Sequence, residues 1–364
     1  MENKLYVSYA PHIRGKETVS ETMLDVLTAL IPALAGGVYF FGIRALFVVL
    51  VSVLASLIFE SLWNMLLKKK NTIGDMSAAV TGVLLAFCLP PSIPLWIVVI
   101  GDFFAIVIVK GFFGGLGQNI VNPALAARAF LLACWPVDMT NYTMPFTNLF
   151  STDAVSGATP LVSEIKPSYF ELFSGKIPGC IGEVSALLLI IGGIYLLIKR
   201  RIDFVIPLCY IGGVGIFGSL LGSGFLFSML SGGVVLAGFF MATDYVTSPM
   251  TMKGQAIYAL FCALVTVVIR KFGGYPEGVT YAILMGNILT PLIDKFAVPR
   301  KFGYVKKAKK LKGGTEFEND KNDKQKNGRR HVSGLSGCGR HCDRQSGKCD
   351  SLCGRGITGK WNGR

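Results

Sequence analysis

Long uninterrupted apolar stretches constrain the fold of this chain more than any other feature. Of its 364 residues, 52% are hydrophobic and only 16% are charged, whereas soluble domains carry about a quarter charged residues. Apolar blocks of about 18 residues or more are typical of transmembrane helices. We therefore expect an all-α integral membrane protein rather than a soluble domain.

The apolar blocks predict about ten transmembrane helices, separated by polar breaks. The predicted segments are residues 22–42, 45–66, 75–92, 94–110, 122–137, 179–198, 203–220, 224–242, 255–270 and 278–297. The segment at 122–137 is short for a span of about 20 residues and is expected to be tilted or re-entrant. The N-terminal residues are polar and lack the apolar core of a cleavable signal peptide.

Basic residues predict the orientation of these segments. The net charge is +14, but the basic residues gather at segment ends and in the C-terminal tail, which argues against nucleic-acid binding. Clusters at 68–70, 199–201 and 306–310 predict a cytoplasmic N-terminus and an even number of crossings. The interval 138–178 then lies on the outer face, and only Arg270-Lys271 violates the rule.

A similar pattern recurs in the two halves of the chain. Glycine-rich endings at 110–115 and 270–274 each follow a proline-containing break, at 89–94 and 247–251. A five-segment unit that is repeated once must be inverted, because five is odd. Inverted repeats with interrupted helices build sites near the membrane midplane. We expect an inverted five-plus-five repeat, with chance recurrence of glycine-rich turns as the alternative.

Polar clusters at 114–128, 242–250 and 275–280 interrupt the apolar background. The first enters its helix through Asn122-Pro123, a cap residue followed by proline. Helix N-termini with free N–H groups bind anions, although such loops also cap helices without any ligand. The presence of several clusters in one bundle favours cofactor or ion binding.

Ionisable residues also fall within or near the apolar segments. They are Asp25, Glu60, Asp102, Arg128 and Glu183. Charges in lipid are costly and usually face a partner or a hydrated cavity. Asp102 is the most central of them and is a candidate ion-pathway carboxylate. A structural ion pair with Arg128 is the alternative, and the sequence leaves both open.

The tail beyond Leu311 has no apolar blocks. Its cysteines, spaced C-x3-C-x6-C-x3-C from Cys338 to Cys353, are of a type that binds zinc or iron–sulfur clusters. No apolar residues near them supply a core that would hold the ligands in place. We expect a disordered basic tail without a metal, and an out-of-frame origin is one hypothesis for it.

The longest polar interval contains Asp153, Ser156, Gly157, Ala158 and Thr159. Small residues before the threonine leave the backbone unobstructed for an enzyme that modifies the hydroxyl, and glycine tolerates unusual backbone conformations. The S-G-A-T run by itself is usually an ordinary loop. The wider D-x-x-S-G-A-T-x-L pattern is more specific.

This wider pattern resembles the flavinylation motif of Rnf- and Nqr-type redox pumps, in which a threonine carries FMN through a phosphoester bond. The resemblance implies that Thr159 is the covalent attachment point. Ser156, Gly157 and Ala158 complete the motif, and Asp153 is expected to serve the FMN transferase. The Nqr resemblance also allows a second, non-covalent flavin, to which no residues are assigned.

The resemblance covers most of residues 1–310. The stretches 75–91, 122–130, 242–254 and 276–294 look like the Rnf D subunit and its homologue, the Nqr B subunit. The resemblance implies a multi-pass subunit of the prokaryotic inner membrane that relays electrons between ferredoxin and NAD, coupled to Na+ or H+ transport. Expected partners are the A, B, C, E and G subunits and membrane lipid. No G-x-G-x-x-G motif follows a strand, so the NAD chemistry is expected in another subunit.

The expected organisation has five parts. These are a cytoplasmic N-terminus (1–21), a first membrane half (22–137), an outer-face loop with the flavinylation motif (138–178), a second membrane half (179–297) and a basic tail (298–364). Two alternatives remain: a B-like subunit of a Na+-translocating NADH:quinone reductase, and a non-redox channel or transporter. Flavin on Thr159 would exclude the channel.

Overall fold

Helices dominate the part of the chain that the computed structural model describes, which is residues 18–69, 72–146, 156–157, 168–183, 185–273 and 278–297. Among these residues, three helices are long and apolar enough to cross a membrane: α1 (Val19–Phe41), α2 (Ile43–Leu66) and α12 (Met252–Phe272). Shorter apolar helices are α3 (Ser77–Phe87), α5 (Pro123–Cys134), α8 (Ala186–Ile198) and α9 (Val205–Leu220). The expectation of a helical fold is confirmed, and the three long apolar helices are consistent with a membrane protein.

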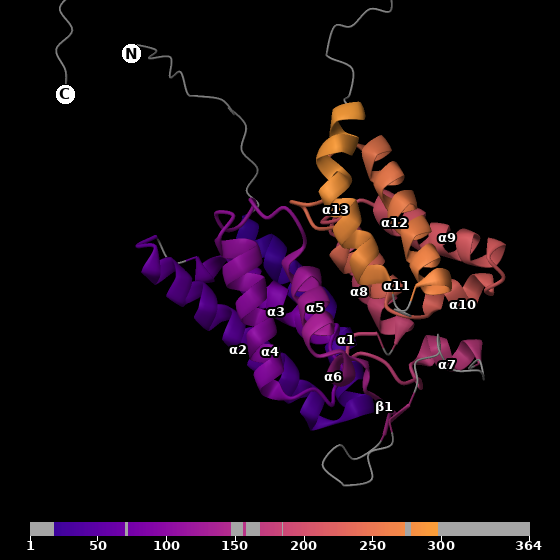
Figure 1. The fold of residues 1–364 in the computed structure, drawn as a ribbon, viewed down its shortest axis with the longest axis horizontal. Coiled ribbons are helices and arrows are strands. Elements are labelled where there is room, and N and C mark those ends of the chain that lie inside the picture. The colour runs from indigo at the N-terminus through magenta and orange to yellow at the C-terminus, as the bar shows by residue number, and fades with distance from the viewer. Residues whose placement is uncertain are drawn as a thin grey trace, which may run out of the picture. The chain divides into compact units, whose positions relative to one another are not determined.

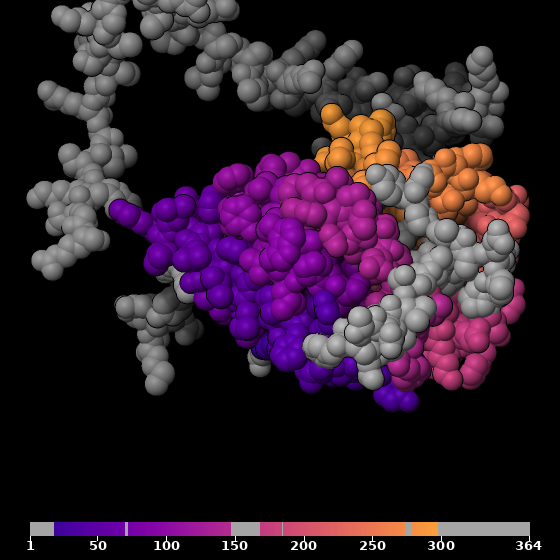
Figure 2. Space-filling view, turned by 60° about the horizontal axis from the view of Figure 1, so that its bottom comes forward, coloured from indigo at the N-terminus to yellow at the C-terminus, as the bar shows by residue number. Residues whose placement is uncertain are grey.

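The remaining elements are shorter pieces and the C-terminal helix α13 (Figure 1). They are the 3₁₀ turn η1 (Ile73–Asp75), α4 (Leu95–Phe103) with its π-helical continuation η2 (Phe104–Gly111), α6 (Pro136–Thr140), the strands β1 (Tyr142–Thr143) and β2 (Ser156–Gly157), α7 (Tyr169–Ser174), α10 (Phe225–Leu230), α11 (Val234–Leu236) with the π-helical η3 (Ala237–Met241), and α13 (Val279–Phe296). Figure 2 shows residues of the first half, in indigo to magenta, beside orange C-terminal residues on one surface.

Local sequence explains where several helices begin and end. Thr18 and Glu21 form a reciprocal capping box at the start of α1. Gly42, with φ at +73°, separates α1 from α2, a conformation that glycine adopts without steric cost. The Asn122 side chain accepts hydrogen bonds from the first backbone N–H groups of α5, and Pro123 occupies the first turn. The predicted helix start at Asn122-Pro123 is confirmed.

Two short helical pieces are buried on every side. All residues of α3 are buried, and so are all residues from Val234 to Met241 in α11 and η3. A helix that is apolar all round must be surrounded by other elements. Each piece is followed by a non-helical, proline-containing segment, at 88–94 and at 242–251. These are the breaks that the sequence placed in corresponding positions of the two halves.

One end of the bundle gathers basic residues, and we call it the basic end. Asp25, near the start of α1, contacts Arg201 in the turn between α8 and α9 at 2.8 Å. Gln255, in the first turn of α12, donates to Asp203 at 2.8 Å. The starts of α1, α9 and α12 therefore lie together at the basic end.

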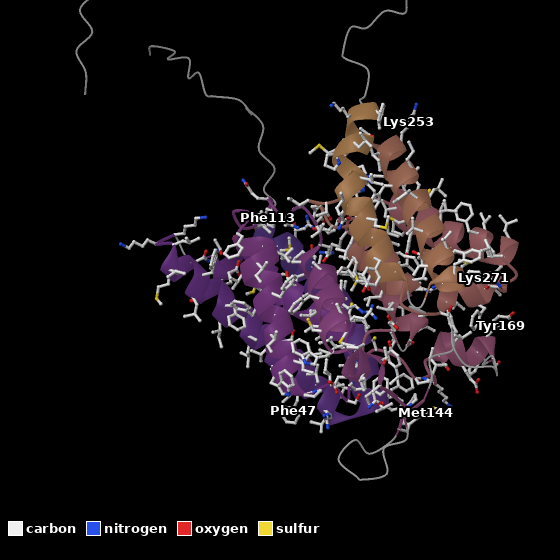
Figure 3. All side chains as sticks on the ribbon, in the orientation of Figure 1. Phe47, Phe113, Met144, Tyr169, Lys253 and Lys271 are labelled. Atoms are coloured by element: carbon white, nitrogen blue, oxygen red, sulfur yellow. The ribbon has the colours of Figure 1, made fainter. Side chains whose placement is uncertain are left out.

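The opposite end, which we call the loop end, holds the segment 139–146. The Phe146 N–H donates to the carbonyl of Phe40 at 2.8 Å, and the Ser92 hydroxyl donates to the carbonyl of Asn141 at 2.8 Å. Figure 3 shows Phe47 and Met144 at this end, far from Phe113 and Lys253.

The segment predicted at 75–92 is helical only from Ser77 to Phe87, and two other predicted segments differ more from the structure. The predicted helix at 224–242 is divided into α10 and α11–η3, because the chain turns at 231–233 and Gly233 has φ at +70°. The predicted helix at 179–198 begins only at Ala186. The backbone before Ala186 forms hydrogen bonds to another segment. The N–H groups of Ile181 and Gly182 donate to the carbonyls of Leu89 and Phe87, respectively. These bonds satisfy groups at the C-terminus of α3, which its own helix cannot pair.

Candidate functional site

The predicted flavinylation motif lies partly within the described residues. Ser156 and Gly157 form β2, which pairs antiparallel with β1, so that Gly157 lies opposite Tyr142 and Ser156 opposite Thr143. Asp153, Ala158 and Thr159 lie outside the described residues. Both residues of β1 are buried against the bundle. The motif is therefore anchored at the loop end, two residues before Thr159 in the sequence.

A buried ion pair lies deeper in the bundle. The Arg128 guanidinium, on α5, is 3.8 Å from Glu183 Oε1 in the segment before α8. The same guanidinium lies 3.6 Å from Cys180 Sγ. The proposed pairing of Arg128 with Asp102 is wrong among the described residues, because the charged partner that Arg128 contacts is Glu183. Sequence reasoning missed this pair, since its members lie in different halves of the chain.

Asp102 lies where α2, α3 and α4 meet. Its Oδ1 atom accepts hydrogen bonds from the hydroxyls of Ser52 at 2.9 Å and Ser56 at 2.8 Å. The Ser52 hydroxyl also lies 2.8 Å from the carbonyl of Gly82, so its single proton is shared between this carbonyl and Asp102. A Cβ atom at Gly82 would lie 2.8 Å from Ser56 Oγ. Glycine at this position lets α3 approach α2 closely enough to bring these oxygen atoms together.

A group of buried polar contacts around Glu60 lies further along α2, towards the basic end. Lys110 Nζ, on η2, is 2.7 Å from Glu60 Oε1 and donates to Ser77 Oγ at 2.7 Å. Thr72 donates to the same Glu60 oxygen at 3.1 Å. The sequence identified Glu60 as an ionisable residue in an apolar segment but missed Lys110 as its partner. The sequence did contain a signal for Lys110, because a lysine at the end of an apolar run is a charge near the membrane segment that needs a partner.

A pocket of about 100 Å³ lies between residues of both halves of the chain. Its polar lining comes from the N-terminus of α3, from η2, and from two of the three polar clusters, namely Ser77, Lys110, Asn119, Asn122, Thr243 and Asp244. Asn122 also donates to the carbonyl of Met241 at 3.2 Å, which links α5 to η3. The described residues of the third cluster, 278–280, do not line this pocket.

Asp244 is the acidic group of the pocket lining. Burial raises the pKa of its carboxyl above the usual range, while hydrogen bonds from Thr247, Asn119 and nearby backbone act in the opposite direction. The neutral form of this carboxyl is therefore favoured over a wider pH range than in water. The pocket combines amides, hydroxyls and one lysine, which are suited to binding a polar or weakly charged group.

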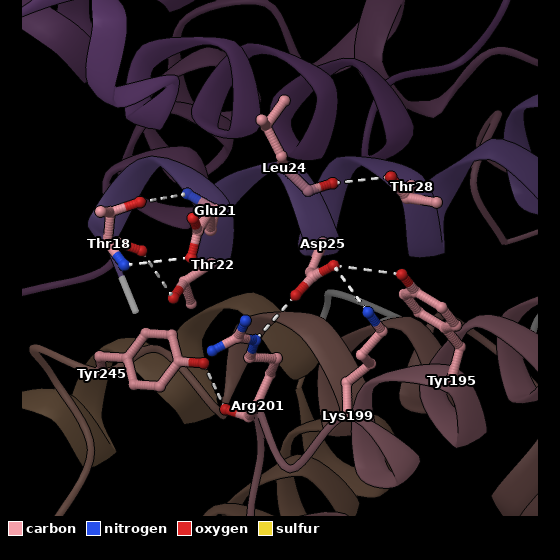
Figure 4. Close-up of polar contacts among 10 residues, drawn as sticks. All are labelled: Thr18, Glu21, Thr22, Leu24, Asp25, Thr28, Tyr195, Lys199, Arg201 and Tyr245. Carbon is pink, nitrogen blue, oxygen red and sulfur yellow. Dashed lines mark hydrogen bonds and ion pairs between the residues drawn. The ribbon is translucent and has the colours of Figure 1, made fainter. Parts of the chain in front are cut away.

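A set of contacts joins α1 to the turn after α8 at the basic end (Figure 4). Asp25 accepts hydrogen bonds from Arg201 at 2.8 Å and Tyr195 at 3.1 Å, and Lys199 lies 3.9 Å away. The Tyr245 hydroxyl donates to the carbonyl of Arg201. The segment 199–201 is thus used partly for structure, in addition to its predicted topological role.

Arg270 was the violation of the charge rule, and its contacts explain why it is tolerated. Its guanidinium donates to the carbonyls of Ser228, Ser231 and Gly232 at 2.9–3.2 Å. These carbonyls belong to the end of α10 and the turn after it. Arg270 therefore acts as a side-chain cap of a helix C-terminus, whereas Lys271 is exposed.

Together these features describe a helical protein with apolar helices, with buried ionisable clusters and with an ion pair, Arg128–Glu183, that joins its two halves. The family model described as the NQR2, RnfD, RnfE family matches residues 6–303. The chain belongs to this family. Residues 304–364, most of the predicted tail, lie outside the match.

Several curated proteins are similar over nearly their whole length. The chain is 50% identical over 320 residues to the D subunit of the Na+-translocating ferredoxin:NAD+ oxidoreductase complex of Acetobacterium woodii, over 85% of this chain and 99% of that protein. It is 46% identical to the D subunit of the proton-translocating ferredoxin:NAD+ oxidoreductase complex of Clostridium ljungdahlii, over 83% of this chain and 97% of that protein. The D subunit of the ion-translocating oxidoreductase complex of Halorhodospira halophila is 37% identical over 80% of this chain and 94% of that protein.

Proposed function

We propose that this chain is the D subunit of an Rnf-type complex and carries FMN on Thr159 as an electron relay between ferredoxin and NAD, coupled to Na+ or H+ transport. The similarity to the D subunits of ion-translocating complexes supports the assignment. The observation that carries the flavin proposal is the D-x-x-S-G-A-T-x-L motif, with Ser156-Gly157 held in a strand at the loop end. The partners are then the other Rnf subunits and an FMN transferase.

The described strand pair fits enzymatic modification of the motif. β1 and β2 form a two-stranded sheet, so the second edge of β2 has no partner strand among the described residues. An unpaired strand edge can be gripped by another protein through main-chain hydrogen bonds. The Thr159 hydroxyl would form the phosphoester, and FMN, when bound, can pass electrons one at a time.

A second, non-covalent flavin was also expected as an option. The pocket between the halves has suitable amides and hydroxyls, but its volume of about 100 Å³ is smaller than the roughly 300 Å³ at which ligand pockets begin. In this conformation the pocket does not fit a flavin, and we derive no electron-transfer step through one.

The proposed topology has ten membrane passes, with the basic end in the cytoplasm and the 138–178 loop outside. The gathering of the starts of α1, α9 and α12 at the basic end supports it, because cytoplasmic ends of spans are enriched in Lys and Arg. The buried, interrupted pieces α3 and α11–η3 support an inverted repeat.

Flavin fluorescence in a denaturing gel tests the proposed attachment. Covalent flavin survives denaturation, so the wild-type band should fluoresce and Thr159→Val should abolish the signal while the protein still inserts into the membrane. Thr140→Val is the matched control, because Thr140 is an exposed threonine on α6 at the same end, and this variant should fluoresce normally. Fluorescence in Thr159→Val would refute the attachment site. A dark wild-type band would favour the non-redox channel.

A further inference from the structure

Asp102 differs in its partners from the acidic residues that form the ion pairs described above. Glu60 contacts Lys110, Glu183 contacts Arg128, and Asp25 contacts Arg201. Asp102 is fully buried, yet no Lys, Arg or His of the described residues forms an ion pair with it. A buried carboxylate normally has a compensating cation.

The two carboxylate oxygens of Asp102 have different surroundings. Oδ1 accepts hydrogen bonds from the hydroxyls of Ser52 and Ser56. Oδ2 is buried and receives no hydrogen bond from any described residue. If Oδ2 carried a proton, that proton would have no acceptor among these residues and would be an unsatisfied buried donor. Oδ2 is thus the atom of this carboxylate that lacks a partner in the described part of the chain.

The polar atoms that the described residues connect to this carboxylate are all oxygens. The hydroxyls of Ser52 and Ser56 and the carbonyl of Gly82 are connected to it, directly or through Ser52, by contacts of 2.8–2.9 Å. Carboxylate, hydroxyl and carbonyl oxygens are the ligands that hard cations prefer.

The buried face of α2 continues this polar environment towards the basic end. Ser52, Ser56, Glu60 and Asn64 are buried at intervals of four residues, so they form one line along the helix, with about 6 Å between successive positions. Glu60 contacts Lys110, and Lys110 donates to Ser77. Lys110 and Ser77 both line the pocket between the halves. The line thus joins the Asp102 cluster to that pocket.

We propose that Asp102, Ser52, Ser56 and the Gly82 carbonyl form a binding site for Na+, reached from the pocket along the polar face of α2. The proposal rests on the ion-transport part of the proposed function and identifies the ion that this protein binds. The π-helical η2 begins at Phe104, two residues after Asp102, which is consistent with a functional position, because π-helical turns often occur at such sites.

The thermal midpoint of the purified full chain in detergent tests the site. A ligand that binds only the folded state raises this midpoint. NaCl should raise the midpoint of the wild type more than KCl at the same ionic strength. Asp102→Asn, which keeps the side-chain shape, should remove the difference. Ser56→Ala should keep it but require about tenfold more Na+, as expected for one lost ligand of about 1.4 kcal/mol.

Asp138→Asn is the matched control, because Asp138 is a partly exposed aspartate on α6, and this variant should respond to Na+ as the wild type does. Equal midpoints of the wild type in NaCl and KCl would overturn the proposal. So would a Na+-specific rise that survives in Asp102→Asn. A thermal midpoint that depends on pH but not on Na+ would also overturn the Na+ site. If Asp102→Asn removed that pH dependence, Asp102 would be assigned to binding a proton instead.

Flavin attachment is measured separately in the same preparations. Thr159→Val should lose covalent fluorescence and keep the Na+-specific rise of the midpoint. A fluorescent wild type without a Na+ response would contradict the ion site alone. A Na+ response without fluorescence would contradict the flavin assignment alone.

Discussion

At the scale of single residues, buried charges are satisfied by partners that are distant in sequence. Arg128 and Glu183 come from different halves, and Asp25 of α1 contacts Arg201 after α8. Such pairs are weak contributors to net stability, but removal of one member leaves a buried charge uncompensated. The stability change when one member of such a pair is replaced is therefore more informative than the presence of the pair.

Glu183→Gln is expected to destabilise the protein by about 3–5 kcal/mol, the usual cost when one member of a buried ion pair is removed. The thermal midpoint in detergent measures this effect. Combining it with Arg128→Met should recover part of the loss, since the two residues interact directly. Asp138→Asn is the control and should change the midpoint little. A double variant as unstable as the sum of its single variants would show that the pair is not coupled.

Asp153, which lies outside the described residues, is the acidic residue of the predicted flavinylation motif. We expect Asp153→Ala to lower the fraction of protein that carries covalent flavin, because the carboxylate is predicted to serve the modifying enzyme. Gel fluorescence normalised to protein amount measures the occupancy. Normal occupancy combined with slow electron transfer would assign Asp153 to the relay instead.

At the scale of elements, close approach of α2 and α3 depends on Gly82. A Cβ atom there would lie 3.0 Å from the carbonyl of Ser52 and 3.1 Å from Cα of Val53. These are backbone atoms, which cannot rotate away as a flexible side chain can. The oxygen cluster around Asp102 therefore requires a glycine at this point of α3.

Gly82→Ala is expected to destabilise the protein by about 1–3 kcal/mol through overpacking. Gly212→Ala is the matched control, because Gly212 is also within a helix but has open space around its Cβ position. That variant should be neutral or stabilised by up to about 1 kcal/mol, owing to the better helix propensity of alanine. Thermal midpoints compare the two, and equal effects would contradict the packing argument.

At the scale of the whole molecule, the proposed topology predicts which residues face each side of the membrane. Cysteines introduced at Ser168 and Lys69 should react with a membrane-impermeant thiol reagent from opposite sides, Ser168 from outside. Ser168 precedes α7 in the predicted outer loop, and Lys69 follows α2 at the basic end. The chain without introduced cysteines corrects for its exposed Cys134. Labelling of both positions from one side would contradict the ten-pass topology.

Much of the architecture follows from the sequence. Apolar blocks longer than about 18 residues have to be helical, because lipid cannot hydrogen-bond to backbone groups. Asn122-Pro123 marked the start of α5 by local chemistry that needs no tertiary contact. The family resemblance rested on contiguous motifs, which the match over residues 6–303 bears out. The number of passes and the flavin attachment stay predictions.

Only the tertiary structure decided which residues the buried charges pair with and where the predicted helices are interrupted. Arg128 pairs with Glu183 rather than Asp102, because the direction a side chain faces depends on how each helix is rotated against its neighbours. The segment before Ala186 is irregular because its N–H groups serve the end of α3, a contact over about 90 residues of chain that no local propensity encodes. The isolation of Asp102 from any described cation is likewise a property of the assembled bundle, since it depends on which side chains α2, α3 and α4 bring to one point.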